Sequence, residues 1–94
     1  MEHRIVRFHG SVQGVGFRYT VERLARRFPG VTGQVFNESN HVTLDIEGEA
    51  TDLTAFVAEI LASLPASARI ESTQTVTLPA CAGQRGFHIG STRS

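Results

Sequence analysis

The chain has 94 residues, 40% of them apolar, and its nine basic and nine acidic side chains give a formal net charge of zero. A chain of this length forms one small domain, and the even charge balance argues against a strongly basic nucleic-acid-binding protein. The lone cysteine, Cys81, excludes an internal disulfide and a multi-cysteine zinc site. No apolar run approaches the roughly 20 residues of a membrane span and no signal peptide is visible, so we expect a cytoplasmic protein with no membrane partner.

Charge is unevenly distributed along the chain. Residues 1–30 contain six arginines and two acidic residues, whereas residues 31–94 contain three arginines and seven acidic residues. The first third is therefore the part expected to face an anion.

The first third of the chain changes from a strand pattern to a helix pattern. Residues 4–9 alternate as a strand does, with Val6 and Phe8 on one side. Three glycines within residues 10–16 then predict a loop with unusual backbone angles. From Phe17 the apolar residues recur at helical spacing, and Pro29-Gly30 ends the predicted helix. Its apolar stripe consists of Phe17, Val21, Leu24, Ala25 and Phe28.

The rest of the chain is predicted to form two strands, a second helix and two further strands. Residues 31–37 and 42–47 predict two strands joined by a tight connection. Thr51 or a neighbour is expected to cap a second helix. Strands are predicted at 69–78 and 86–90, separated by a loop over 79–85. The second helix has the apolar stripe Leu53, Phe56, Val57, Ile60, Leu61 and Leu64.

The predicted order is βαββαβ with a short extra C-terminal strand. Two amphipathic helices can both be covered by one face of a single sheet, which favours an α+β, ferredoxin-like sandwich with an antiparallel sheet. In that topology the first two strands are parallel and the third lies between them. The glycine loop, Arg18 and Asn37 should therefore meet at one edge of the sheet, about 10 Å apart across two strand spacings.

That edge has the features of an anion site. A glycine loop that enters a helix offers free backbone N–H groups and the positive end of the helix dipole. Arg18 adds a planar guanidinium that can hold two phosphate oxygens. The loop is not a Walker A sequence, and Tyr19 stands where G-x-G-x-x-G would place its third glycine. The glycines alone are equally compatible with a sharp strand-to-helix turn.

Two segments resemble the signatures of the acylphosphatase family. Residues 10–18, GSVQGVGFR, resemble G-x-V-Q-G-V-x-F-R, and residues 33–37, GQVFN, resemble G-x-V-x-N. The resemblance extends over nearly the whole chain and implies a single acylphosphatase-like domain over residues 1–94. Gln34 replaces a frequent aromatic residue, Asn40-His41 lacks a frequent turn glycine, and the Pro29-Gly30 connection is one residue longer than usual.

The resemblance implies hydrolysis of the carboxyl–phosphate bond of acyl phosphates to a carboxylate and inorganic phosphate. Arg18 and the loop amides would bind the phosphoryl group, and Asn37 would hold the attacking water. The substrate-binding residues implied besides Arg18 are Ser11, Val12, Gln13, Gly14, Val15, Gly16 and Phe17. A carboxylate leaves without a proton donor because its conjugate acid has a pKa of about 4–5. We therefore expect no metal and no cofactor.

Alternatives remain beside this interpretation. A non-catalytic anion-binding module would share the fold. The same type of domain also opens a large hydrogenase-maturing carbamoyltransferase, where a proline commonly follows the motif arginine in place of Tyr19. Single-stranded RNA binding would need stacking aromatics that the strands lack, Phe8 being expected in the core. The four histidines are expected as scattered surface residues, with His9 the one nearest the loop, and Ser11 as a loop-shaping residue. We expect a monomer.

Overall fold

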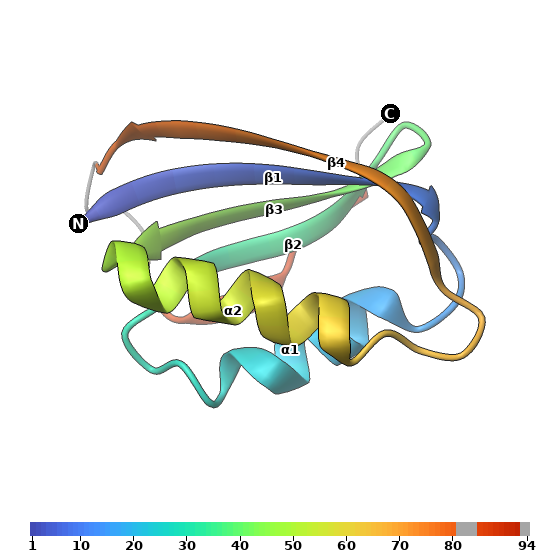
Figure 1. Cartoon of the computed structure of the whole chain (residues 1–94), viewed down its shortest axis with the longest axis horizontal. Helices are drawn as coiled ribbons and strands as arrows, with labels where there is room; N and C mark the ends of the chain where they lie inside the picture. The colour runs from blue at the N-terminus through green and yellow to red at the C-terminus, as the bar shows by residue number, and fades with distance from the viewer. Residues whose placement is uncertain (81–84, 93–94) are drawn as a thin grey trace.

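The protein is described by a computed structural model over residues 1–80 and 85–92. The elements in chain order are β1 (Glu2–Ser11), α1 (Phe17–Ala25), β2 (Thr32–Glu38), β3 (His41–Gly48), α2 (Ala50–Ala62), β4 (Arg69–Pro79) and β5 (Phe87–Ile89). Both helices lie on the same side of one twisted sheet (Figure 1). The predicted order of elements and the ferredoxin-like sandwich are confirmed.

The sheet has the strand order β4-β1-β3-β2-β5. β3 pairs antiparallel with both β1 and β2, as predicted, and β1 pairs antiparallel with β4. β5 instead pairs parallel with β2, so the prediction of an antiparallel sheet needs this one correction. The parallel pair is possible because β2 and β5 are joined by long crossovers through other elements, as parallel neighbours require.

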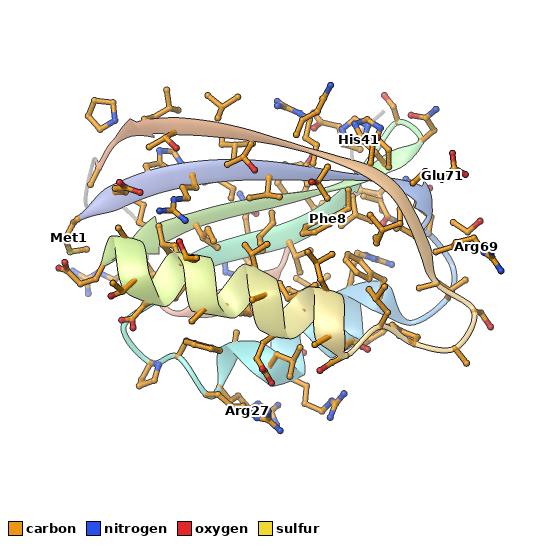
Figure 2. The ribbon with its side chains drawn as sticks, viewed as in Figure 1. Met1, Phe8, Arg27, His41, Arg69 and Glu71 are labelled. Carbon is orange, nitrogen blue, oxygen red and sulfur yellow. The ribbon has the colours of Figure 1, made fainter. Side chains whose placement is uncertain are left out.

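The core fills the space between the sheet and the helices. Val6 and Phe8 of β1 are fully buried, and Figure 2 shows Phe8 between the sheet and α2. The alternate positions of β3, Val42, Leu44 and Ile46, are also fully buried and face the same layer. The helices contribute the buried side chains of Phe17, Val21, Leu24, Leu53, Phe56 and Ile60. Both predicted apolar stripes are therefore largely confirmed as core.

α1 is shorter than the periodicity predicted, because the apolar stripe reaches Phe28 whereas the helix ends at Ala25. The following amides of Arg27 and Phe28 donate to carbonyls three residues back, at 3.0 Å each. This tighter winding precedes Pro29, and a residue before proline is disfavoured in the α conformation. Phe28 still packs against the core, with its ring centroid 5.4 Å from that of Phe56.

The start of α2 also differs from the prediction. The residue that precedes the helix is Glu49, which is extended and makes no side-chain cap, so Thr51 lies inside the first turn. Leu61 of the predicted stripe is 42% exposed, since it lies at the margin of the face that buries Leu53, Phe56 and Ile60. Part of the predicted loop over 79–85, including Cys81, lies outside the described residues.

Candidate active site

The loop between β1 and α1 depends on two glycines with left-handed backbone angles. Gly14 has a φ of 72° and Gly16 a φ of 82°. A left-handed backbone costs a residue with a Cβ about 1–2 kcal/mol, so glycine is the residue suited to both positions. A Cβ at either glycine would meet no atom within 4 Å. Open space therefore lies above the loop backbone, where a ligand can approach it.

The first turn of α1 has no side-chain cap. Gly16 stands at the N-cap position, and Thr20 provides the first helical amide bonded to its carbonyl, at 3.1 Å. The N–H groups of residues 17–19 consequently have no partner within the helix, and they carry the positive end of its dipole. An uncapped helix start beside a glycine loop suits a phosphate-sized anion.

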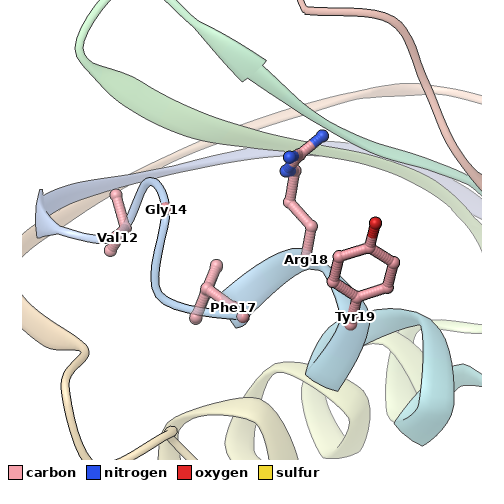
Figure 3. A pocket seen from close by; sticks show the side chains of 6 residues that line it. Val12, Gly14, Phe17, Arg18 and Tyr19 are labelled. Carbon is pink, nitrogen blue, oxygen red and sulfur yellow. The ribbon is translucent and has the colours of Figure 1, made fainter.

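Arg18 lies in this first turn and its side chain is half-buried. Within residues 1–80 and 85–92 its guanidinium makes no hydrogen bond or ion pair that would occupy it. A pocket of about 240 Å³ opens beside it, lined by Val12, Gly14, Gly16, Phe17, Arg18 and Tyr19. Figure 3 shows the Arg18 side chain extending from the start of α1 toward the sheet. A charged group held without a partner in this way is available to an anion.

The residues implied as substrate-binding are only partly brought together. Val12 and Phe17 line the pocket, but these residues are only 2% and 1% exposed and belong to the core. Ser11, Gln13 and Val15 do not line the pocket. Ser11 ends β1, where it pairs with Arg69 of β4. That pairing agrees with a loop-shaping role for Ser11.

Asn37 lies near the end of β2 and does not line this pocket. It pairs across the sheet with Val42, and the next pair along is Glu38 with His41. Its side-chain Oδ1 is buried and has no hydrogen-bond partner among the described residues. A buried acceptor left without a partner costs about 1–3 kcal/mol, so this oxygen is suited to accept from a small polar ligand or water.

Two of the four histidines lie together, contrary to the prediction that all four are scattered. His9 and His41 are register partners on β1 and β3, and their ring centroids lie 4.9 Å apart. The His41 Nε2 atom lies 3.5 Å from Glu38 Oε1 without hydrogen-bond geometry. His3 contacts Asp45 further along the sheet. Sequence spacing alone could not reveal these pairs, because strand register decides which residues face each other.

Two further properties bear on function. Among residues 1–80 and 85–92, no three His, Cys, Asp or Glu side chains are grouped as metal ligands would be. The helices of this same part of the chain include none with the length and apolar character needed to cross a membrane.

Sequence reasoning missed one residue of the pocket. Tyr19 lines it beside Arg18 and is 68% exposed. In the sequence it differs from the core aromatics only by its place on the polar side of the helix stripe. Its adjacency to Arg18 is the one signal that could have found it.

The fold and this loop define a class: a ferredoxin-like domain with a glycine-rich loop ahead of its first helix. The acylphosphatase family profile matches residues 4–89. The chain is 33% identical to an acylphosphatase of Clostridium acetobutylicum over 90 residues, covering 95% of this chain and 97% of that one. It belongs to the acylphosphatase family and is an acylphosphatase-type hydrolase.

The chain is also similar to a solved acylphosphatase structure and to part of a much longer relative. A Bacillus subtilis acylphosphatase superposes with a TM-score of 0.85 at 28% identity, covering 96% of this chain and 99% of that one. The chain is also 39% identical over 80 residues to carbamoyltransferase HypF of Rhizobium leguminosarum bv. viciae. That match covers 85% of this chain, which spans 10% of the length of the relative. Similar sequence thus makes up nearly all of one relative and a small part of a much longer one.

Proposed function

We propose that this protein hydrolyses the carboxyl–phosphate bond of small acyl phosphates, releasing a carboxylate and inorganic phosphate. The observation that supports this most directly is the Arg18 guanidinium, which has no partner among the described residues and borders the same pocket as Gly14 and Gly16. An acyl phosphate presents phosphoryl oxygens to such a site, and one arginine can hold two of them.

The loop and the helix start would hold the phosphoryl group. Backbone N–H groups of residues 12–17, together with the uncapped first turn of α1, would donate to its oxygens. Phosphoryl transfer proceeds through a loose transition state, and its catalysis consists mostly of positioning and charge stabilisation. Fixed amides and one guanidinium supply both, and they need no reorganisation as the bond breaks.

Asn37 would position the attacking water. Its buried Oδ1 has no partner among the described residues, and an acceptor of this kind can take a hydrogen from a water molecule. Asn37 comes from a different element than the phosphate loop, so water and phosphate would be held by separate parts of the fold. The water oxygen attacks phosphorus, the bond from phosphorus to the acyl oxygen breaks, and the water protons pass to phosphate and solvent.

The leaving group explains why so few residues suffice. A carboxylate has a conjugate acid of pKa about 4–5 and departs without a proton donor. The proposal therefore includes no general acid and no metal, consistent with the lack of a three-ligand cluster within residues 1–80 and 85–92. It also predicts discrimination against phosphate esters of alcohols, whose leaving group is a far stronger base.

A non-catalytic anion-binding module of the same fold is the second candidate. The pocket would serve it equally well, but the unpartnered Asn37 oxygen would then have no use. The likeness to part of a carbamoyltransferase makes carbamoyl phosphate a substrate worth testing beside acetyl phosphate.

Phosphate release by the purified protein tests these alternatives. Acetyl phosphate, carbamoyl phosphate and glycerol phosphate are compared at equal concentration, with uncatalysed hydrolysis subtracted. The proposal expects turnover of one or both acyl phosphates and none of glycerol phosphate. Phosphate binding without turnover of any acyl phosphate would establish the binding module instead.

A further inference from the structure

The Gln13 side chain connects the glycine loop to a second part of the active-site edge. Its Nε2 atom donates to the backbone carbonyl of Ser39 at 3.1 Å and to that of His41 at 2.9 Å. Both hydrogens of the side-chain amide are thereby used, one on each carbonyl. Gln13 itself does not line the pocket beside Arg18.

The receiving segment is the turn between β2 and β3, directly after Asn37. Ser39 has a φ of 50°, a left-handed backbone angle that is uncommon for residues other than glycine. The turn lies at the end of the sheet where β1 also ends (Figure 1). His41 begins β3 and pairs with Glu38, the neighbour of Asn37. The two hydrogen bonds thus join the loop to the hairpin that carries Asn37.

Within residues 1–80 and 85–92, no other side-chain hydrogen bond joins the loop to the hairpin, although the two must cooperate in the proposed reaction. The left-handed backbone angles of Gly14 and Gly16 and the uncapped start of α1 would be enough for the loop to surround a phosphate. The position of the loop relative to Asn37 is a separate matter, which the backbone angles of the loop do not determine. Displacement by about 1 Å of one reacting group from another can cost as much as 100-fold in rate.

We propose that Gln13 is a positioning residue, whose side-chain amide holds the phosphate loop in register with Asn37. Phosphate would then bind almost as well without the Gln13 amide, but the water on Asn37 would no longer be aligned with phosphorus. This inference rests on the proposed function, since it concerns how the two halves of that site are held together.

The first experiment removes the donor and retains the side-chain length. Gln13→Met is compared with Thr75→Val, a loss of a polar side-chain group on exposed β4, at a residue that makes no side-chain hydrogen bond within residues 1–80 and 85–92. For Gln13→Met we expect kcat for acetyl phosphate to fall about 10-fold, within the range for misplaced groups. The inhibition constant of inorganic phosphate should change less than about 3-fold, which is no more than the effect of one weak hydrogen bond. Thr75→Val should match the wild type, and thermal unfolding confirms that both variants are folded.

The second experiment separates positioning from a general structural role. Gln13→Met is combined with Asn37→Ala, and the enzyme is used at a concentration high enough to measure the slower double variant. If Gln13 acts through Asn37, its removal should lower kcat less than about 2-fold in the Asn37→Ala background, because coupled residues are not additive. A full 10-fold further loss in that background would overturn the proposal. So would unchanged kcat in Gln13→Met, or a loss of phosphate binding equal to its loss of turnover.

These outcomes are distinct from failure of the proposed function. A wild-type protein without acyl phosphate turnover would refute the hydrolysis proposal before any variant is compared. An active wild type with an unaffected Gln13→Met variant would refute the positioning role alone.

Discussion

Phe8 and Phe17 pack edge to face in the core, with their ring centroids 5.2 Å apart. Phe8 lies in β1 two residues before Gly10, and Phe17 is the first residue of α1, so the pair holds the two ends of the glycine loop close together. Both rings are fully buried. The two ends of the loop are thus anchored in the core by buried aromatic rings, although Gln13 and Gly14 at its tip are exposed.

Truncation of either ring of the Phe8–Phe17 pair should destabilise the whole domain. Phe17→Ala removes a 1% exposed aromatic ring, which typically costs about 3–5 kcal/mol in the free energy of unfolding. Tyr19→Ala is the control, because Tyr19 is 68% exposed and its loss should cost about 0.5 kcal/mol or less. Urea unfolding measures both. A cost below about 1 kcal/mol for Phe17→Ala would contradict the core role of this ring.

Phosphate binding should require the guanidinium group of Arg18. Arg18→Ala should lose most inhibition by inorganic phosphate and most turnover, and Arg18→Lys should recover little, because an ammonium lacks the two-pronged guanidinium. Arg23→Lys, on the exposed side of the same helix, is the matched control and should be unaffected. Wild-type rates in Arg18→Lys would show that Arg18 contributes only charge.

Asn37 should affect turnover more than binding. Asn37→Ala removes the proposed water acceptor, and the loss of one such hydrogen bond should raise the barrier by about 2–4 kcal/mol, or about 30- to 1,000-fold in kcat. The inhibition constant of inorganic phosphate should stay within a few-fold of the wild type. Asn40→Ala, in the exposed turn, is the control. Parallel losses of binding and turnover would place Asn37 in the phosphate site instead.

Activity should survive removal of divalent metals. The proposed site uses a guanidinium, an amide and backbone N–H groups, and the described residues include no cluster of three metal-ligating side chains. Hydrolysis of acetyl phosphate is measured after exhaustive dialysis against EDTA, with a mock-dialysed sample beside it. Loss of activity that Mg²⁺ restores would refute the metal-free mechanism.

The pH dependence of kcat should follow the substrate. Arginine, asparagine and backbone amides do not titrate between pH 5 and 8, so no two-sided bell from an acid–base pair is expected. The second ionisation of a phosphate monoester lies near pH 6, and a single inflection of this origin should move when the acyl phosphate is changed.

The neighbouring rings of His9 and His41, at the same end of the sheet, allow a direct test of this prediction. His9 pairs with His41, whose backbone carbonyl accepts from Gln13. Profiles of kcat against pH are therefore measured for wild type and His9→Gln with two acyl phosphates. An inflection that is common to both substrates and absent in His9→Gln would mean that the proposed residues are not sufficient.

Local patterns in the sequence predicted most of the fold. Alternation in β1 and β3 and the helical spacing in α1 and α2 correctly identified most core residues of these elements, because these periods follow from backbone geometry. The predicted end of α1 and the predicted cap of α2 were wrong. Hydrogen bonds to carbonyls three residues back follow α1 before Pro29, and an extended Glu49 precedes α2. Both features depend on competition between local turn conformations. The parallel pairing of β5 with β2 depends on how distant segments pack and has no periodic signal.

The candidate site divides in the same way. The sequence by itself determined the parts that local chemistry dictates: glycines where the loop turns left-handed, an arginine in the first turn of a helix, and an asparagine near a strand end. Only the tertiary structure decided which groups meet: the Gln13 amide with the carbonyls of Ser39 and His41, and the ring of His9 with that of His41. The physical reason is that these contacts join elements far apart in the chain, and their geometry is set by strand register and loop placement, which no short segment specifies.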